Sequence, residues 1–376
     1  MADKVLKRID WLLVLFVSPI ILAGLVTMKN FTVDANGPDF FTRQLVWVAV
    51  SFAVFFIFSF IDFRFLKRTD VLVTIFLFTC SILLLLFILG YVSNGAKSWF
   101  NFGLFSFQPA DMVKLVLVII LAKYFSRRHV EIGDIKHIFI SGVYAFIPLF
   151  LVLLQPDFGS AMIIGAIWLG MVLVSGIRKM HLFFVFTSGV LVFVMLWMFV
   201  FAPYQKARIM NFINPLADIH GTGYNAFQST IAVGSGQIVG KGLGFGTQSR
   251  LKFLPEPQTD FIFAAYAEEW GLIGSLLLLT LYGLVFWRIL YSATLGASNF
   301  EILFGMGIAI FFMSHILINV GMNLGLMPVT GIPLPFMSYG GSHLLTEFAA
   351  LGILMSMRRY GRSVHRDDMK HEFLGV

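Results

Sequence analysis

The residues of this chain that could do chemistry are charged side chains beside or inside long apolar stretches. Asp260 ends a 59-residue segment, Ala202 to Asp260, and directly precedes the apolar run that starts at Phe261. A carboxylate at such a border can have its pKa raised by desolvation or lowered by a cation, and either change suits acid–base chemistry. Asp260 is therefore our candidate general base. Because Asp is also a favoured helix N-cap, a purely structural role stays open.

Asp111 and Lys114 are a second candidate pair, three residues apart inside another apolar run. On a helix this spacing puts both side chains on one face, where they can form an ion pair. An ionisable group at membrane depth costs roughly 2.5–3.5 kcal/mol on insertion scales, so such residues are functional candidates by default. The pair either fixes helix packing or contacts an anionic substrate.

The segment Ala202 to Asp260 also contains a Gly-rich stretch from Gly234 to Gly246. It fits neither common nucleotide-binding pattern. It is either a tight turn that another segment approaches closely, or a loop whose N–H groups, with Lys241, face a phosphate or pyrophosphate. The whole segment holds five basic and three acidic residues, a balance that suits an anionic lipid head group.

Three acids in and after this segment, Asp260, Glu256 and Glu268, are the candidates for a metal site. Their hard oxygen ligands suit Mg²⁺ or Mn²⁺. Sequence spacing alone leaves a metal requirement open, so a divalent cation is a possible cofactor and no other is expected. The histidines have no partner at zinc-binding spacing, so no zinc site is indicated.

The composition of the chain indicates what kind of secondary-structure elements position these residues. Of 376 residues, 58% are hydrophobic and 12% charged, against about 25% charged in a soluble domain. This excludes a soluble enzyme and a disordered protein. The one cysteine, Cys80, excludes a disulfide framework or thiolate metal cluster within the chain. We expect an all-α polytopic membrane protein in which residues 1–376 form a single integral membrane domain.

Ten apolar runs are long enough to cross about 30 Å of hydrocarbon. They lie at 11–28, 45–61, 71–91, 109–125, 138–154, 160–175, 182–201, 261–287, 303–324 and 343–357. Alternating the connections between two sides puts 18 of the 27 Lys and Arg residues on the side of the N-terminus. By the positive-inside rule both termini are then cytoplasmic, with a cytoplasmic tail at 358–376 and a large extracytoplasmic loop at 202–260, between helices 7 and 8. The net charge of +7 thus reflects topology, and no nucleic-acid partner is expected.

An uncharged segment with three prolines, Met327 to Ser342, joins the last two runs. Irregular backbone at membrane depth is tolerated only where protein covers it or a cavity lies beside it, so we expect a re-entrant wall of the site. His315, with Asn319 and Asn323 one and two turns later, is expected to hydrogen-bond between helices.

Together these segments resemble the SEDS (shape, elongation, division and sporulation) family, and its rod-shape members more than its division members. The resemblance runs in order from about Arg43 to Met357 and rests on several long motifs. They are Phe107-Gln108-Pro109-Ala110-Asp111-Met112-Val113-Lys114, Gln155-Pro156-Asp157-Phe158-Gly159-Ser160-Ala161, Pro203-Tyr204-Gln205-Lys206-Ala207-Arg208-Ile209, Gln228-Ser229, Gly234-Ser235-Gly236, Gly244-Phe245-Gly246-Thr247-Gln248, Leu254-Pro255-Glu256, Thr259-Asp260-Phe261, Thr330-Gly331-Ile332-Pro333-Leu334-Pro335 and Ser338-Tyr339-Gly340-Gly341-Ser342.

The resemblance implies a ten-helix peptidoglycan glycosyltransferase in the bacterial cytoplasmic membrane. It would polymerise lipid II on the extracytoplasmic face during cell-wall elongation, with a class B penicillin-binding protein and the elongation machinery as partners. The family's essential Asp maps onto Asp260, and a second important acid maps onto Glu268. Its usual Glu…Lys pair maps onto Asp111 and Lys114, with a shorter acid here. Ser98 stands where the family commonly has Arg before Trp, so no role is transferred to it.

The expected reaction is an inverting glycosyl transfer from a MurNAc whose leaving group is undecaprenyl pyrophosphate. Asp260 would take the proton of the acceptor GlcNAc 4-hydroxyl, while Arg208, Lys241 and Lys114 would stabilise the pyrophosphate. Lipid-facing helices would hold the prenyl chains. The other expected substrate-binding residues are Asp111, Gln228, Ser229, Ser235, Thr247, Gln248, Glu256, Glu268 and Ser338. A lipid II flippase gated by Asp111 and Lys114, or a non-catalytic scaffold that activates its penicillin-binding partner, stays as an alternative.

Overall fold

The fold was analysed in a computed structural model of the chain. It describes residues 9–372, apart from 30, 32–38, 94–95, 102, 104–105, 128–134, 215–217, 219–220 and 222. The N-terminal basic residues Lys4, Lys7 and Arg8, which entered the topology prediction, lie outside this range.

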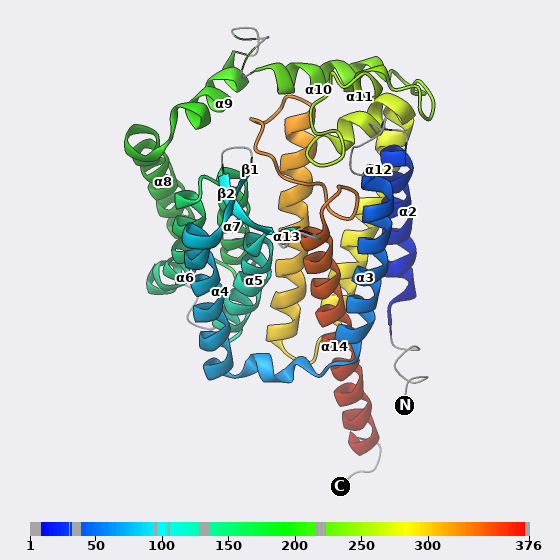
Figure 1. The fold of residues 1–376 in the computed structure, drawn as a ribbon. Helices are drawn as coiled ribbons and strands as arrows, with labels where there is room; N and C mark the ends of the chain where they lie inside the picture. The colour runs from blue at the N-terminus through cyan, green and yellow to red at the C-terminus, as the bar shows by residue number, and fades with distance from the viewer. Residues whose placement is uncertain are drawn as a thin grey trace.

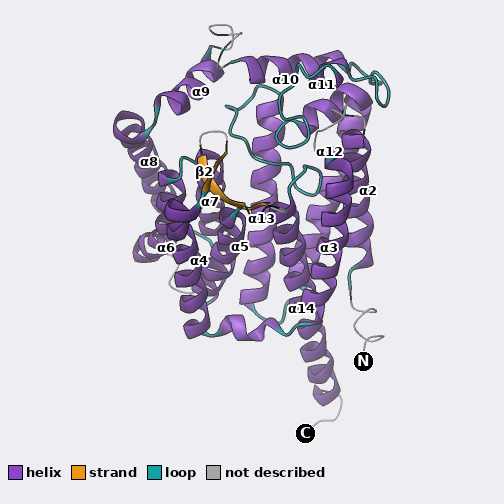
Figure 2. Cartoon of the chain, in the orientation of Figure 1, coloured by secondary structure: helices purple, strands orange, loops and turns teal. Residues whose placement is uncertain are grey.

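Helices dominate the structure, and the long ones fall on the ten predicted apolar runs (Figure 1 and Figure 2). They are α2 (Trp11–Lys29), α3 (Phe40–Phe60), α4 (Thr69–Leu89), α5 (Pro109–Ser126), α6 (Ile135–Leu154), α7 (Phe158–Val174), α8 (Lys179–Met195), α12 (Ile262–Thr294), α13 (Asn299–Asn323) and α14 (Gly341–Glu372). Within the described part of the chain, seven helices are long and apolar enough to cross a membrane. The other three are α7, which has only 17 residues, and α5 and α14, which carry buried charged residues.

A small antiparallel sheet lies between α4 and α5. Its strands β1 (Tyr91–Ser93), β2 (Ala96–Asn101) and β3 (Ser106–Phe107) pair in the order β1-β2-β3. The all-α prediction is therefore incomplete, because these three short strands connect two helices. Ser98, to which no role was transferred, is buried in β2.

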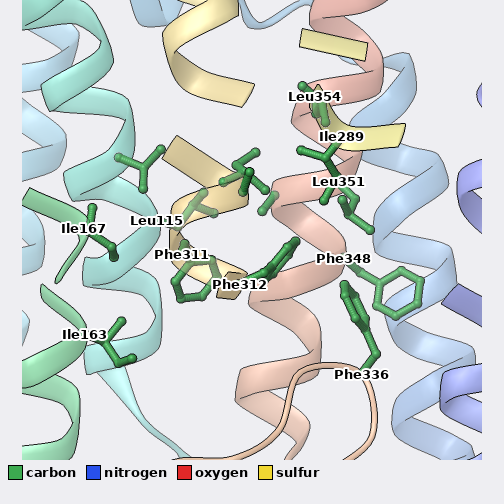
Figure 3. Packing of buried hydrophobic residues seen from close by; sticks show 14 of the residues in the cluster. Leu115, Ile163, Ile167, Ile289, Phe311, Phe312, Phe336, Phe348, Leu351 and Leu354 are labelled. Carbon is green, nitrogen blue, oxygen red and sulfur yellow. The ribbon is translucent and has the colours of Figure 1, made fainter. Parts of the chain in front are cut away.

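The core of the bundle is built from α5, α7, α12, α13 and α14, whose apolar side chains interlock (Figure 3). Phe312 of α13 packs against Phe336, and Phe336 packs edge-on against Phe348 of α14. α8, with the π-helical turn η2 (Leu196–Val200), exposes most of its apolar side chains at the edge of the bundle. A short 3₁₀ helix, η1 (Phe63–Lys67), joins α3 to α4.

The long segment before α12 folds into three helices over one end of the bundle. They are α9 (Pro203–Ile213), α10 (Tyr224–Ser235) and α11 (Thr247–Arg250). α14 ends on the opposite side of the molecule (Figure 1). The described parts of this segment therefore form a cap on the bundle.

Candidate active site

Asp260 lies at the turn that leads into α12, where contacts from two directions hold its backbone. Its carbonyl oxygen accepts hydrogen bonds from the side-chain amides of Asn319 (2.9 Å) and Asn323 (3.1 Å), one turn apart on α13. The hydroxyl of Ser338 donates to the carbonyl of Thr259, at 2.6 Å. The N-cap of α12 is Phe261 and no side chain caps this helix. Helix capping therefore does not account for Asp260.

The Asp260 carboxylate faces Gly331 in the segment that joins α13 to α14. A Cβ atom built on Gly331 would lie 3.3 Å from the carboxylate Oδ2, and Gly331 has a φ of +72°, which favours glycine. Asn319 also donates to the carbonyl of Ile332, at 2.7 Å. One α13 side chain thus ties Asp260 to this segment, which agrees with the predicted wall of the site and with the predicted bonding role of Asn319.

The pKa of Asp260 is raised to about 7, first by burial and then by the negative charge of Glu256, with Asp157 acting in the same direction. The Arg208 guanidinium opposes these effects and lowers the pKa. A carboxyl that is half ionised near neutral pH is well suited to accept a proton during a reaction. Helix α9, through Arg208, and the start of α7, through Asp157, therefore act electrostatically on the same carboxyl.

Asp157 is a site residue that the sequence did not single out. Its Oδ1 accepts from the amide of Ser160 (2.9 Å) and caps α7, while its Oδ2 accepts from Gln108 Nε2 (2.8 Å), just before α5. The triplet Gln155-Pro156-Asp157 at the edge of an apolar run was the available signal. Its relation to Asp260 required the tertiary structure.

Glu268 is fully buried on α12, and residues of the segment that precedes this helix surround its carboxylate. Hydrogen bonds reach it from Lys241 Nζ (2.7 Å), Thr247 Oγ1 (3.1 Å) and the amide of Gln248 (3.0 Å), and Ser235 Oγ lies at 3.5 Å. Four expected substrate contacts therefore converge on one acid. This geometry favours an anchoring role for all five residues.

The Gly-rich stretch packs directly on the backbone of α12. Cβ atoms on Gly236 and Gly240 would approach the carbonyl oxygens of α12 to 2.0 and 2.1 Å. The amides of Lys241 and Gly242 donate to the carbonyl oxygens of Glu268 and Glu269, both at 3.0 Å. α12 is interrupted opposite this turn at Gly271, where φ is +65°. The turn interpretation is confirmed, and these amides bond to protein instead of facing a phosphate.

Asp111 and Lys114 form the predicted ion pair, 3.0 Å apart, with both side chains about 2% exposed. The shorter acid does not open the pair. Ser342 Oγ donates to the other Asp111 oxygen at 3.1 Å, and His343 Nδ1 lies 3.5 Å from Asp111 Oδ1. Such complete enclosure favours the packing role over direct contact with a substrate.

The remaining expected site residues either support the backbone near Asp260 or lie at the protein surface. Ser229 is buried on α10 and donates to the carbonyl of Asn323 at 3.0 Å, behind Asp260. Glu256 is exposed and accepts from Gln258 Nε2 at 2.9 Å. Gln228 is partly exposed beside Ser229.

The three acids considered for a metal site are not brought together, because Glu268 faces the Lys241 cluster. Across the described ranges, no three His, Cys, Asp or Glu side chains are arranged to hold a metal ion. Of these acids, Glu256 is the one whose charge acts on Asp260.

Known proteins are similar to this chain in sequence and in fold. The family model FTSW_RODA_SPOVE, of cell cycle proteins, matches residues 5–363. Stage V sporulation protein E of Bacillus subtilis is 37% identical over 94% of this chain and 98% of its own length. Peptidoglycan glycosyltransferase MrdB of Escherichia coli is 38% identical over 74% of this chain and 75% of its own. A chain of a peptidoglycan synthase complex that coordinates polymerization and crosslinking has a TM-score of 0.79 and 30% identity, covering 94% of this chain and 98% of that one. The chain therefore belongs to the FtsW, RodA and SpoVE family of cell cycle proteins, which is the SEDS family that its motifs resemble.

Proposed function

We propose that this protein is a peptidoglycan glycosyltransferase that polymerises lipid II, with Asp260 as the general base. The observation that carries the proposal is one carboxyl, Asp260, with a pKa of about 7 and a backbone fixed by α13 and the segment from Gly331 to Ser338. The Escherichia coli relative that bears this enzyme name is 38% identical, and this chain covers three quarters of it.

In the proposed reaction the 4-hydroxyl oxygen of an acceptor GlcNAc attacks the anomeric carbon of a donor MurNAc. The bond from that carbon to undecaprenyl pyrophosphate breaks, and the configuration inverts. The Asp260 carboxylate takes the hydroxyl proton, a contribution worth roughly 10²- to 10⁴-fold in rate.

Arg208 is the cation best placed to stabilise the departing pyrophosphate. It acts electrostatically on Asp260 and its side chain is partly exposed. Of the three cations expected in this role, Arg208 is the one that acts on the Asp260 carboxyl. Lys114 forms an ion pair with Asp111, and Lys241 forms one with Glu268. Charge placed where the leaving group develops negative charge is a large contribution to catalysis.

A divalent cation fits this reaction as an ion shared with the substrate. Mg²⁺ is usually held by one or two carboxylates together with substrate phosphates. Glu256 would supply the carboxylate, and the ion would neutralise the pyrophosphate. Dependence of polymerisation on Mg²⁺ or Mn²⁺, measured after chelation, tests this part separately.

The proposed topology has ten spans, both termini in the cytoplasm and residues 202–260 outside the cytoplasmic membrane. Seven apolar helices and the position of α9–α11 opposite the end of α14 support it. The buried charges of α5 and α14 explain why these two helices fall short on apolarity alone. Asp260 then lies at the extracytoplasmic surface, where polyprenyl-linked sugars meet water.

The proposed partner is a class B penicillin-binding protein of the elongation machinery. The likeness to a chain of a peptidoglycan synthase complex supports a partner that crosslinks the glycan strands. A flippase is less well supported, because a transport path needs accessible mid-membrane charges and Asp111 and Lys114 are enclosed and paired.

The test is glycan formation from lipid II by the purified protein together with its penicillin-binding partner. Asp260→Ala should lose roughly 100-fold or more of the rate. The matched control Asp70→Ala, at an exposed ion pair with Arg68 at the start of α4, should keep it. Equal activity of Asp260→Ala refutes the base assignment. No polymer from the wild type with any partner would instead favour the flippase or the scaffold.

A further inference from the structure

The segment from Gly331 to Ser338, here called the wall segment, connects Asp260 to a group of buried charges. On one side, Gly331 faces the Asp260 carboxylate and Ser338 donates to the carbonyl of Thr259. On the other side, the amide of Phe336 donates to Glu347 Oε2 on α14, at 2.9 Å. The wall segment is therefore held at both faces.

Phe336 has an unusual backbone conformation for its residue type, with a φ of +61°. A bulky side chain in the left-handed region persists only where its surroundings enforce that conformation. Its ring is buried against Phe312 and Phe348 (Figure 3), and its amide is fixed by Glu347. Glu347 therefore holds the wall segment at its most strained residue.

Glu347 is the last member of a row of four buried ionisable side chains. Its Oε1 lies 2.9 Å from His343 Nε2, and His343 Nδ1 lies 3.5 Å from Asp111 Oδ1. Asp111 pairs with Lys114. The row runs from α5 to α14 and ends at the wall segment.

The charges around His343 favour an imidazolium, although neither ring nitrogen has hydrogen-bond geometry to its neighbouring carboxylate. Each ring nitrogen faces a carboxylate oxygen, and a neutral ring carries a proton on only one nitrogen. Two carboxylates and one ammonium leave a net negative charge, which a protonated His343 cancels. Burying an uncompensated charge is costly.

The other groups that face this row also contact the wall segment. His315 of α13 stacks near His343, with ring centroids 4.7 Å apart, and its Nδ1 lies 3.3 Å from the carbonyl of Pro333. Tyr282 of α12 donates to the carbonyl of Pro335 at 2.6 Å. The neighbouring helices thus converge on the same few residues.

We infer that His343 and Glu347 are positioning residues for Asp260. The imidazolium orients the Glu347 carboxylate, Glu347 fixes Phe336, and the wall segment thereby places Gly331 against the Asp260 carboxyl. Both side chains are buried, so their proposed effect on the reaction passes through the wall segment. The inference rests on the proposed function, since it concerns how the proposed base is held.

Removal of charges within the row provides the test. His343→Gln leaves one unbalanced negative charge, so kcat for lipid II polymerisation should fall roughly 10- to 100-fold, as for other supporting residues, with KM within about twofold. His343→Gln with Glu347→Gln removes both charges and should regain most of the lost rate. Ser356→Ala is the control, because this buried α14 hydroxyl bonds to the carbonyl of Ile61, away from the row.

A wild-type kcat in His343→Gln would overturn the inference. A double variant no faster than His343→Gln would also overturn it. If the two substitutions only damaged packing, their losses of rate would add, whereas restored charge balance should make the double variant faster than the single one. Should His343→Gln fail to fold, Glu347→Gln alone takes its place. It should lower kcat, and wild-type kcat in that variant overturns the inference equally.

Hydrogen exchange gives a readout that does not depend on catalysis. Exchange at the Phe336 amide, followed in the peptide over residues 331–340, should be faster in His343→Gln and return toward wild type in the double variant. If exchange responds but the wild type makes no polymer, the proposed function fails and the positioning contact stands. If the wild type polymerises and exchange is unchanged, the positioning role alone is refuted.

Discussion

Replacing Glu256 with Gln should move the acid limb of the pH–rate profile of polymerisation to lower pH. Glu256 is exposed, and its negative charge is, after burial, the largest cause of the raised pKa of Asp260. A general base works only as the carboxylate, so the rate rises as pH passes through its pKa. With a pKa of about 7, the ionised fraction is about 0.1 at pH 6 and about 0.9 at pH 8, which gives roughly a ninefold increase.

In Glu256→Gln the midpoint falls, so the ratio of the rates at pH 8 and pH 6 becomes smaller. Burial and Asp157 still act on Asp260, and they keep its pKa above the ordinary value of 3.8. Arg208→Gln should shift the midpoint the opposite way, because it removes the cation that lowers the pKa. Opposite shifts from two substitutions are hard to explain by altered folding.

The assay is the initial rate of glycan formation from lipid II across this pH range, with the partner's crosslinking site blocked by penicillin. Asp70→Asn removes an exposed carboxylate that pairs with Arg68, and it should leave the profile unchanged. A wild-type rate that stays flat between pH 6 and pH 8, or an unshifted midpoint in Glu256→Gln, would refute this view of Asp260.

Three further predictions concern stability and the segment that precedes α12. Asp260→Asn should raise Tm at pH 8, because it removes the cost of ionising a buried carboxyl in the folded state. With a pKa of about 7 in the folded state against 3.8, this loss of folding free energy is absent below pH 3.8, grows between pH 3.8 and 7, and is complete above pH 7. Its upper limit is about 4 kcal/mol, and the real value is smaller because the side chain is partly exposed. A Tm difference independent of pH would contradict this. Lys114→Ala removes the ammonium paired with Asp111, leaves one buried negative charge uncompensated, and should lower the free energy of unfolding by about 3–5 kcal/mol; lost activity at unchanged Tm would point to substrate contact instead. Glu268→Ala removes the shared acceptor of Lys241 and the Gln248 amide, so proteolysis and hydrogen exchange over residues 236–250 should accelerate; unchanged exchange at Gln248 would exclude the anchoring role.

Features set by local sequence could be predicted. The helices follow from apolar runs of sufficient length, and the Asp111–Lys114 pair follows from helical spacing. Asp260 stood out because a carboxylate at the border of an apolar run is unusual. The wall segment followed from prolines without charges between two apolar helices.

Features that depend on tertiary contacts could not be predicted from the sequence. Glu268 and the Gly-rich turn meet because α12 breaks at Gly271, and nothing in the sequence around either one specifies the other. The pairing of His343 with Glu347 was not predicted, and its role depends on Asp111 of α5, which is distant in the sequence. The strands between α4 and α5 are too short to give a reliable alternating pattern.

A comparison of lipid II binding with glycan formation in Asp260→Asn at pH 8 separates bond formation from substrate binding. If Asp260 is the general base, the dissociation constant for lipid II stays within about twofold of wild type while the rate of glycan formation falls roughly 100-fold or more. Polymerisation at the wild-type rate, or a loss of binding as large as the loss of rate, would contradict that role.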